Sequence, residues 1–289
     1  MNIQTYLEDR YVLEKKLSIG HEKNLSRTVQ RFADFAGDLE LSELTPTIVN
    51  KWLIHCEDQG WSSTTIKNMR SELLSIWRHA ADADECDDFK SRRIRKITPV
   101  VRCPMAWTAR EVESLLEIVK AMRGEFSFGV AHRLYFEATI RAAYDTGLRR
   151  GDLFGLSVDA IDPASLTVRT MQRKTQSEHV SKLTTESFMA LKRLSEHEEA
   201  LGLDHYQTPL QWPSKSHQQL YDAWKALRTI AGIRKDGAFQ MTRRTAATQV
   251  ELNQPGAATQ FLGHQTPDLA RKHYIDKSQL NPIQPPKLE

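Results

Sequence analysis

The sequence predicts a mainly α-helical protein with one small β-sheet, organised as two domains. Its 289 residues are enough for two domains that each bury a core of their own. Apolar residues recur at helical spacing along most of the chain. Only Leu166–Met171 and His179–Leu183 alternate apolar and polar residues, as two paired strands do, and the polar segment 172–178 between them is predicted to be their turn.

Residues 1–96 are predicted to form a small domain of four or five helices. Leu25–Asp38 carries apolar residues at the spacing of one helix face. Thr45 and the following proline are a typical start of a helix, because the hydroxyl caps it and proline suits its first turn. Ser62 or Ser63 caps another helix, whose buried side is expected to carry Ile66, Met69, Leu73, Leu74 and Trp77.

Residues 97–107 are predicted to be a basic linker, because two prolines and a basic composition fit an extended segment. The second domain then spans 108–289 and begins with a capping box formed by Thr108 and Glu111. Three prolines argue against a regular helix in its tail, residues 281–289. Further helices are expected at Leu134–Tyr144, Thr185–Glu199, His217–Ala231, Thr242–Leu252 and Gly256–Leu262.

The composition is that of an ordinary globular protein, with 40% hydrophobic and 27% charged residues. No apolar run approaches the roughly 18 residues that span a bilayer, and the N-terminus has no apolar signal core. Three widely spaced cysteines argue against a disulfide framework and a zinc cluster. We therefore expect a cytoplasmic protein with no membrane partner, no metal and no other cofactor.

The net charge of +3 is weak evidence for a nucleic-acid partner, but its distribution is more informative. No acidic residue interrupts the segment from 89 to 110. This basic run is either a solvated linker or a strap that follows a phosphate backbone. The candidate DNA-binding residues in it are Lys90, Arg92, Arg93, Arg95 and Lys96.

Residues able to cleave a phosphodiester are found in three short motifs. Arg149 follows Thr-Gly-Leu, Arg243 precedes Arg-Thr-Ala-Ala-Thr, and His264 ends a Leu-Gly-His segment ten residues before Tyr274. Two arginines can neutralise phosphate oxygens, a histidine can donate to them, and a tyrosine can attack phosphorus. The alternatives are structural: an ion pair of Arg149 with Asp152, a core histidine at 264, and a tyrosine that only packs.

In this order and spacing the motifs resemble the tyrosine recombinase (phage integrase) family. The resemblance implies that Tyr274 is the nucleophile and forms a 3′-phosphotyrosyl intermediate, leaving a free 5′-hydroxyl, so that neither ATP nor a metal is needed. It assigns phosphate binding to Arg149, rather than to Arg150, and to Arg243 and His264. Asp152 matches the acidic position of the family, which orients other groups.

The resemblance also implies a catalytic lysine in a turn between two strands. Lys174 fits this position and would protonate the leaving 5′-oxygen, with Lys182 as a weaker rival and a solvated turn lysine as the plain alternative. Gln240 stands where the family usually has a histidine. Because a glutamine cannot exchange a proton near neutral pH, we expect a slower enzyme, one that uses another proton acceptor, or an inactive one.

The family architecture implies a helical, SAM-like core-DNA-binding domain and a catalytic domain that clamp a DNA duplex. The size is that of a two-domain, Xer-like recombinase, and we expect no arm-binding domain, because helical pattern starts almost at once. The resemblance implies two protomers on each DNA recombination site and a homotetramer in the synapse. The tetramer would exchange strands through a Holliday junction, and it would act at the nucleoid in the cytoplasm. The sequence leaves open whether the reaction is integration, excision, resolution or inversion, and whether an accessory directionality protein takes part. Two other functions also remain open: an inactive DNA-binding relative and a type IB topoisomerase-like activity.

Overall fold

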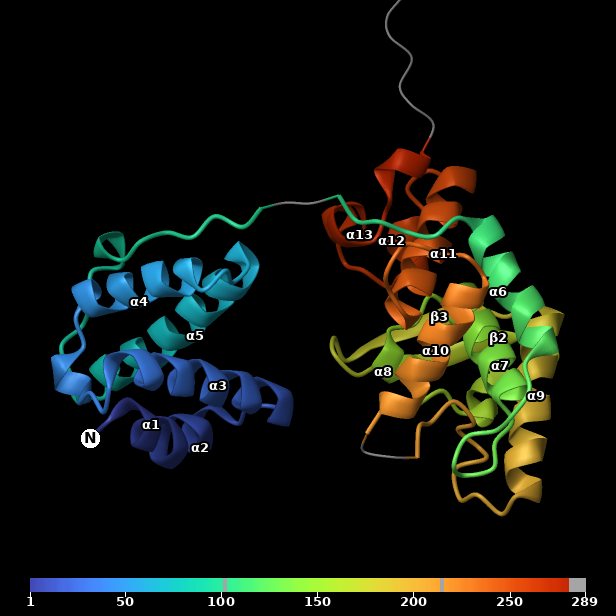
Figure 1. The fold of residues 1–289 in the computed structure, drawn as a ribbon, viewed down its shortest axis with the longest axis horizontal. Coiled ribbons are helices and arrows are strands. Elements are labelled where there is room, and N and C mark those ends of the chain that lie inside the picture. The colour runs from blue at the N-terminus through green and yellow to red at the C-terminus, as the bar shows by residue number, and fades with distance from the viewer. Residues whose placement is uncertain (101–102, 214–215, 281–289) are drawn as a thin grey trace, which may run out of the picture. The chain divides into compact units, whose positions relative to one another are not determined.

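The computed structural model describes residues 1–100, 103–213 and 216–280, and the chain divides into two compact units, Met1–Arg102 and Cys103–Glu289 (Figure 1). Both units are built mainly of helices, and the second also holds a small antiparallel sheet. The predicted fold class is confirmed. The tail from 281 to 289, for which we expected no regular helix, lies outside the described residues.

The N-terminal unit packs α3 and α4 against α5. The predicted caps are present: Thr45 accepts from the backbone N–H of Ile48, and Ser62 from that of Thr65. The third helix begins six residues before the expected Leu25, because Ser18 caps it. The elements are α1 (Ile3–Tyr6), the π-helical η1 (Leu7–Tyr11), α2 (Val12–Lys15), α3 (Ile19–Ala36), the 3₁₀ turn η2 (Leu41–Glu43), α4 (Pro46–Asp58), α5 (Ser63–Asp82) and the 3₁₀ turn η3 (Ser91–Arg93).

The predicted linker is anchored at both ends. Ile97 is buried in the core of the N-terminal unit, and Trp107 is buried in the core of the C-terminal unit. Upstream of it, Asn50 on α4 donates to the carbonyl of Arg93 and accepts from the backbone N–H of Arg95. The basic run therefore packs along the N-terminal unit before the chain enters the linker.

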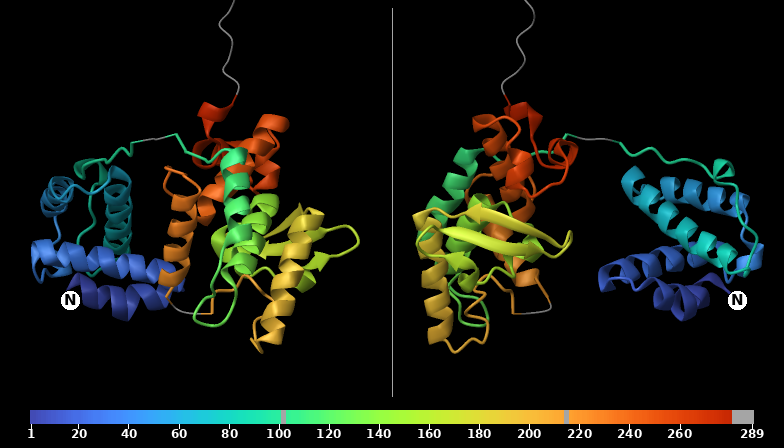
Figure 2. Two further views of the ribbon diagram at one scale, coloured as in Figure 1. Left: turned by 45° about the vertical axis from the view of Figure 1, so that its right-hand side comes forward. Right: turned by 180° about the vertical axis from the view of Figure 1, so that it is seen from behind.

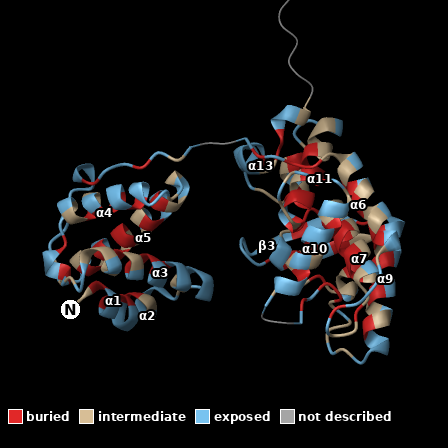
Figure 3. Ribbon diagram, viewed as in Figure 1, coloured by how far each residue is buried: buried red, intermediate tan, exposed pale blue. Residues whose placement is uncertain are grey.

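The C-terminal unit surrounds α7, against which α6, α9 and α11 pack. Its elements are α6 (Ala109–Ala121), α7 (His132–Thr146), α8 (Arg150–Leu153), the 3₁₀ turn η4 (Val158–Ala160), β1 (Ile161–Asp162), β2 (Thr167–Gln172), β3 (Ser177–Lys182), α9 (Thr185–Ala200), α10 (Gln218–Ile230), α11 (Phe239–Asn253), α12 (Ala258–Phe261), α13 (Pro267–His273) and the 3₁₀ turn η5 (Lys277–Gln279). Figure 3 shows buried residues concentrated in α7 and α11.

The sheet has the order β1-β2-β3, and both pairs are antiparallel. The hairpin of β2 and β3 confirms the predicted strand pair, whereas the two-residue β1 was not expected. Gln172 pairs with Ser177, so the turn between the strands spans residues 173–176 and extends from the body of the unit (Figure 2).

The C-terminal unit has two apolar clusters. The larger one contains Trp107, Tyr135, Phe136 and Trp224. The smaller one lies at α12 and α13 and consists of Ala247, Ala258, Leu262, Ala270 and Ile275, with Tyr274 packed against it. The small side chains let the segment that carries Tyr274 lie close to α11. No helix in the described part of the chain is long and apolar enough to cross a membrane.

Candidate active site

Four predicted site residues, Arg149, Arg243, His264 and Tyr274, lie together in the C-terminal unit. They come from the α7–α8 turn, the first half of α11, the α12–α13 connection and the end of α13. The Cζ atom of Arg243 is 4.8 Å from the centre of the Tyr274 ring, and the His264 ring centre is 4.9 Å from it. The folded chain thus joins residues that are 125 positions apart in sequence.

Arg243 is the buried centre of this group, with no exposed surface. Its Nη1 donates to the carbonyl of Gly147, and its Nη2 donates to the carbonyl of Leu262 at 3.2 Å. Burial is the main cause that lowers the pKa of Arg243, to about 10, so the guanidinium stays charged at neutral pH. Its buried Nε has no partner among the described residues, so one of its donors is unpaired.

Two glycines make the close approach of these segments feasible. Gly147 caps α7 in the left-handed region, at φ +58°, where a side chain is strained. A Cβ there would lie 2.5 Å from the ring of Phe261. Gly263 has φ +63°, and a Cβ there would lie 2.7 Å from Nε2 of Gln172 and 2.9 Å from Nδ1 of His179. Both motif glycines are therefore required by conformation and by space.

Arg149 is half-buried and contacts a residue that sequence reasoning missed. Its Nη1 donates to Oε1 of Gln172, which is fully buried at the end of β2. Nε2 of Gln172 donates in turn to the Leu262 carbonyl at 3.2 Å, which also binds Arg243. A signal was present in the sequence, since Gln172 lies four residues after Val168 and so on the buried face of an alternating strand, where a polar residue is unusual.

One alternative role for Arg149 was an ion pair with Asp152. That ion pair is not present among the residues that the structure describes. The side chain of Asp152 is buried, and Oδ1 accepts from the backbone N–H of Arg173 at 2.9 Å. Its Oδ2 is buried without a partner among the described residues. Asp152 thus holds the start of the β2–β3 turn rather than a catalytic side chain.

Lys174 is not brought into contact with the other site residues. It is exposed in the β2–β3 turn and has no hydrogen bond or ion pair with any described residue. Its position, directly after Arg173, is nevertheless controlled through Asp152. Lys182, the rival lysine, is exposed inside β3.

His264 is neutral at physiological pH. Burial is the main cause that lowers its pKa to about 4, and the positive charges of Arg243, Arg149 and His273 act in the same direction. Nη2 of Arg243 lies 3.3 Å from Nε2 of His264. Because a guanidinium only donates, Nε2 accepts and the proton is on Nδ1. That Nδ1 is buried without a partner in the described chain, so it remains a free donor.

Tyr274 stands at the end of α13 and is partly buried. Burial raises the pKa of its hydroxyl, but the charges of Arg243 and Arg149 and side-chain hydrogen bonds from Gln240 and Arg243 outweigh burial and place the pKa below its ordinary value. Gln240 itself is exposed in the first turn of α11. The site therefore makes the phenolate, the form of tyrosine that can attack phosphorus, easier to form than in a free tyrosine.

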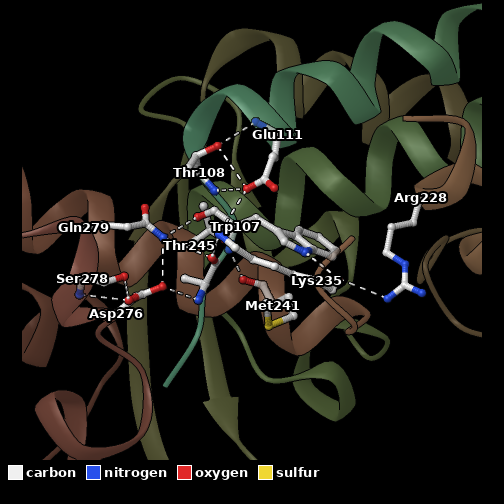
Figure 4. Close-up of polar contacts among 11 residues, drawn as sticks. Trp107, Thr108, Glu111, Arg228, Lys235, Met241, Thr245, Asp276, Ser278 and Gln279 are labelled. Atoms are coloured by element: carbon white, nitrogen blue, oxygen red, sulfur yellow. Dashed lines mark hydrogen bonds and ion pairs between the residues drawn. The ribbon is translucent and has the colours of Figure 1, made fainter. Parts of the chain in front are cut away.

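The segment that follows Tyr274 is fastened to the end of the linker (Figure 4). The buried Asp276 accepts from the backbone N–H of Ala106 at 2.9 Å, and Gln279 donates to the carbonyls of Ala106 and Trp107. Trp107 donates from its backbone N–H to Thr245 on α11. These bonds set the position of the chain two residues beyond the tyrosine.

The five candidate DNA-binding residues all belong to the N-terminal unit and are exposed. Arg95 forms an ion pair with Glu57 at 2.7 Å. The other four, Lys90, Arg92, Arg93 and Lys96, have side chains without a hydrogen bond or ion pair to any residue that the structure describes. No three His, Cys, Asp or Glu side chains within the described ranges are grouped as a metal site.

Comparison with known proteins gives a consistent result. A lambda integrase fragment in a dimer bound to a COC′ core site has a TM-score of 0.73 at 19% identity, covering 100% of this chain and 99% of that one. XerH recombinase bound to palindromic difH gives 0.72 at 15% identity, covering 89% and 76%. The Tn1549 transposon integrase with circular intermediate DNA gives 0.67 at 15%, covering 98% and 96%. No curated protein matches the sequence.

These likenesses establish a common fold and nothing more, because the identities are all below 20%. Membership is established by the sequence itself, in which residues 106–280, more than half of the chain, match the model named Phage integrase family. The matched segment contains every one of the motifs around Arg149, Arg243, His264 and Tyr274. The chain accordingly belongs to the phage integrase family of tyrosine recombinases.

Proposed function

We propose that this protein is a site-specific DNA recombinase that cuts and rejoins DNA through Tyr274. The phenolate oxygen attacks the scissile phosphorus, a P–O bond to tyrosine forms, and the bond from phosphorus to the 5′-oxygen breaks. The products are a 3′-phosphotyrosyl protein and a 5′-oxygen that takes up one proton to become a hydroxyl. Rejoining reverses these steps with the 5′-hydroxyl of another strand, so bond energy is conserved.

The observation that carries the proposal is the contact of Tyr274 with a buried arginine and a neutral histidine. Nε of Arg243 and Nδ1 of His264 are donors without a partner among the described residues. Together with Arg149 they offset the charge that develops on a pentacoordinate phosphorus, which is stabilisation of the transition state. Each group is held before substrate arrives, so little reorganisation is needed.

Proton movement assigns different roles to Gln240 and Lys174. The amide of Gln240 can donate to the phenolate but cannot accept its proton, so that proton passes to solvent, aided by the lowered pKa of Tyr274. Lys174 protonates the leaving 5′-oxygen. Its turn is held at Arg173 by Asp152, and the exposed Lys174 side chain has no partner among the described residues, so it is available to the leaving oxygen.

The proposed assembly follows the structural neighbours. Structures of lambda integrase hold a dimer on a core site and a tetramer on a Holliday junction. We infer two protomers per recombination site and four in the synapse, acting at the nucleoid in the cytoplasm. In the N-terminal unit, the exposed side chains of the basic run would contact phosphates.

Covalent trapping tests the proposal. The protein is mixed with nicked suicide duplexes cut from the DNA that flanks its own gene, and the products are resolved on a denaturing gel. We expect an adduct that Tyr274→Phe does not form. A band-shift titration on the same duplex should show two protomers per site.

A second candidate, a DNA-binding relative without cleavage, is favoured by Gln240. It predicts site-specific binding with no adduct from any variant. Relaxation of supercoiled plasmids that lack a site, by wild type but not by Tyr274→Phe, would instead indicate a topoisomerase-like activity with the same chemistry.

Replacing Gln240 by histidine tests the proton step. If transfer of the Tyr274 proton limits the reaction, Gln240→His should speed adduct formation, by about 10²–10⁴-fold on the usual scale of general-base assistance. An unchanged rate would show that proton transfer at this position is not limiting. Gln240→Asn, which keeps an amide but no base, is the control.

A further inference from the structure

We propose that Gln172 is a positioning residue that holds Arg149 for phosphate binding without reducing its charge. The inference rests on the proposed function, because it concerns the same phosphate-binding arginines. Gln172 touches no substrate in this assignment. It acts through Arg149 and through the segment that carries His264.

The contacts of Gln172 use both ends of its amide. Oε1 accepts from Nη1 of Arg149 and from the hydroxyl of Thr175, the latter at 3.1 Å, while Nε2 donates to the Leu262 carbonyl at 3.2 Å. Since guanidinium and carbonyl have fixed donor and acceptor characters, this orientation of the amide is the one that satisfies all three. The side chain is fully buried, so water does not compete.

The side chain of Arg149 has no other hydrogen bond or ion pair among the described residues. A free arginine side chain samples many rotamers, and ordering it costs conformational entropy. Gln172 meets that cost before DNA binds. Without it the guanidinium would be half-buried and unattached beside the scissile phosphate.

The neutrality of the amide is the second part of the argument. A glutamate at 172 would also accept from Arg149, but its negative charge would offset the charge that the phosphate requires. It would also place a carboxylate oxygen against the Leu262 carbonyl, where Nε2 now donates. A buried neutral acceptor holds the arginine and leaves its charge for the substrate.

Gln172 also connects the two arginines. The Leu262 carbonyl accepts from Gln172 and from Nη2 of Arg243, both at 3.2 Å. The next residue, Gly263, lies so close that a Cβ would be 2.7 Å from Nε2 of Gln172. The amide therefore spaces Arg149 from the turn that presents His264.

Single-turnover adduct formation at saturating DNA tests the proposal, with two substrates: the natural phosphodiester and a methylphosphonate that lacks the negative charge at the scissile position. On the phosphodiester we expect Gln172→Met to slow cleavage about 10- to 10²-fold, less than Arg149→Ala at about 10²–10³-fold. The double variant should be no slower than Arg149→Ala, because both changes remove one interaction. On the methylphosphonate the losses in both single variants should largely disappear.

Gln172→Glu keeps the size of the side chain and serves if Gln172→Met does not fold, with thermal melting as the check on folding. It should be slow on the phosphodiester and close to wild type on the methylphosphonate. A purely structural role for Gln172 predicts equal losses on both substrates. That result, wild-type rates in folded variants, or additive losses in the double variant would overturn the proposal.

Failure of the proposed function gives a different result. The wild type itself would then form no adduct on DNA that it binds, and the positioning role would fall with it. An adduct from wild type with unaffected Gln172 variants would remove the positioning role alone.

Discussion

The two units of this protein differ in what they bury. Among the described residues of the N-terminal unit, Thr28 is the one buried polar side chain. The C-terminal unit buries Thr139, Thr146, Asp152, Gln172, His179, Ser187, Glu198, Thr242, Arg243, Thr245, Thr248 and Asp276. Burying polar groups costs free energy unless they are hydrogen-bonded, so the contrast indicates that the second core serves chemistry as well as folding.

The buried polar groups of the C-terminal unit are themselves of two kinds. Arg243 and Gln172 are hydrogen-bonded, and both donate to the carbonyl of Leu262. Glu198 differs, because both of its oxygens are buried without a hydrogen bond in the described structure, and His205 is 3.8 Å away. Burial raises the pKa of Glu198 and lowers that of His205, so the pair is neutral rather than an ion pair.

The largest combined effect, on both rate and stability, is expected from Arg243→Ala. It removes a phosphate ligand, leaves the Gly147 carbonyl without its side-chain donor and removes one of the two donors to the Leu262 carbonyl. We expect adduct formation to fall about 10²–10³-fold or more and the free energy of unfolding to fall by about 3 kcal/mol. Rates are measured well below the melting temperature. Arg193→Ala, which removes an exposed arginine paired with Glu137, is the control and should change neither strongly.

Lys174→Met should affect the rate alone, since Lys174 is exposed and has no partner to lose. Cleavage of a phosphodiester should slow about 10²–10⁴-fold, with unchanged DNA affinity and melting temperature. In a substrate with sulfur in place of the 5′-oxygen, the leaving group departs as a thiolate and needs no acid. This substrate should therefore restore the rate of Lys174→Met. If Lys182→Met shows this behaviour and Lys174→Met does not, the assignment of the general acid is wrong.

Asp276→Ala sharpens the comparison by removing the anchor of the Tyr274 segment. Burial raises the pKa of Asp276, but hydrogen bonds from Ser278, from the Ala106 backbone and from Gln279 outweigh it and lower the pKa below the ordinary value. We expect a loss of about 2 kcal/mol of unfolding free energy at neutral pH. A lowered pKa stabilises the fold above the unfolded value of 3.8 and stops doing so as pH falls below it. Equal losses at pH 3 and pH 7 would contradict this.

Glu198→Gln changes stability alone and is expected to change it with the opposite sign. The pKa of Glu198 is raised by burial from 4.5 to about 8, so between these values the unfolded chain has lost a proton that the folded chain keeps. Stability of the wild type therefore falls as pH rises through this window. Glu198→Gln should be more stable by about 1–3 kcal/mol at pH 8 and close to wild type at pH 5, measured by denaturant unfolding. A constant difference would mean that Glu198 is not the titrating group.

Much of the fold could be predicted from local sequence. The caps at Thr45, Ser62 and Thr108 form as expected, because a hydroxyl bonds to a backbone N–H three residues away and needs no distant partner. The start of α3 was missed, since its first turn is exposed and carries no apolar period. The two-residue β1 was missed because it exists only by pairing with β2.

The amino-acid sequence was sufficient to determine the family, the order of the motifs and the residue types able to carry the chemistry. These depend only on which residues are present and how they are spaced along the chain. Tertiary structure alone decided the partner of Arg149, the tautomer of His264 and the lowered pKa of Tyr274. Each of these depends on distances and burial between segments far apart in sequence. Hydrogen bonds and charge interactions act over a few ångströms in space, and a linear pattern does not contain those distances.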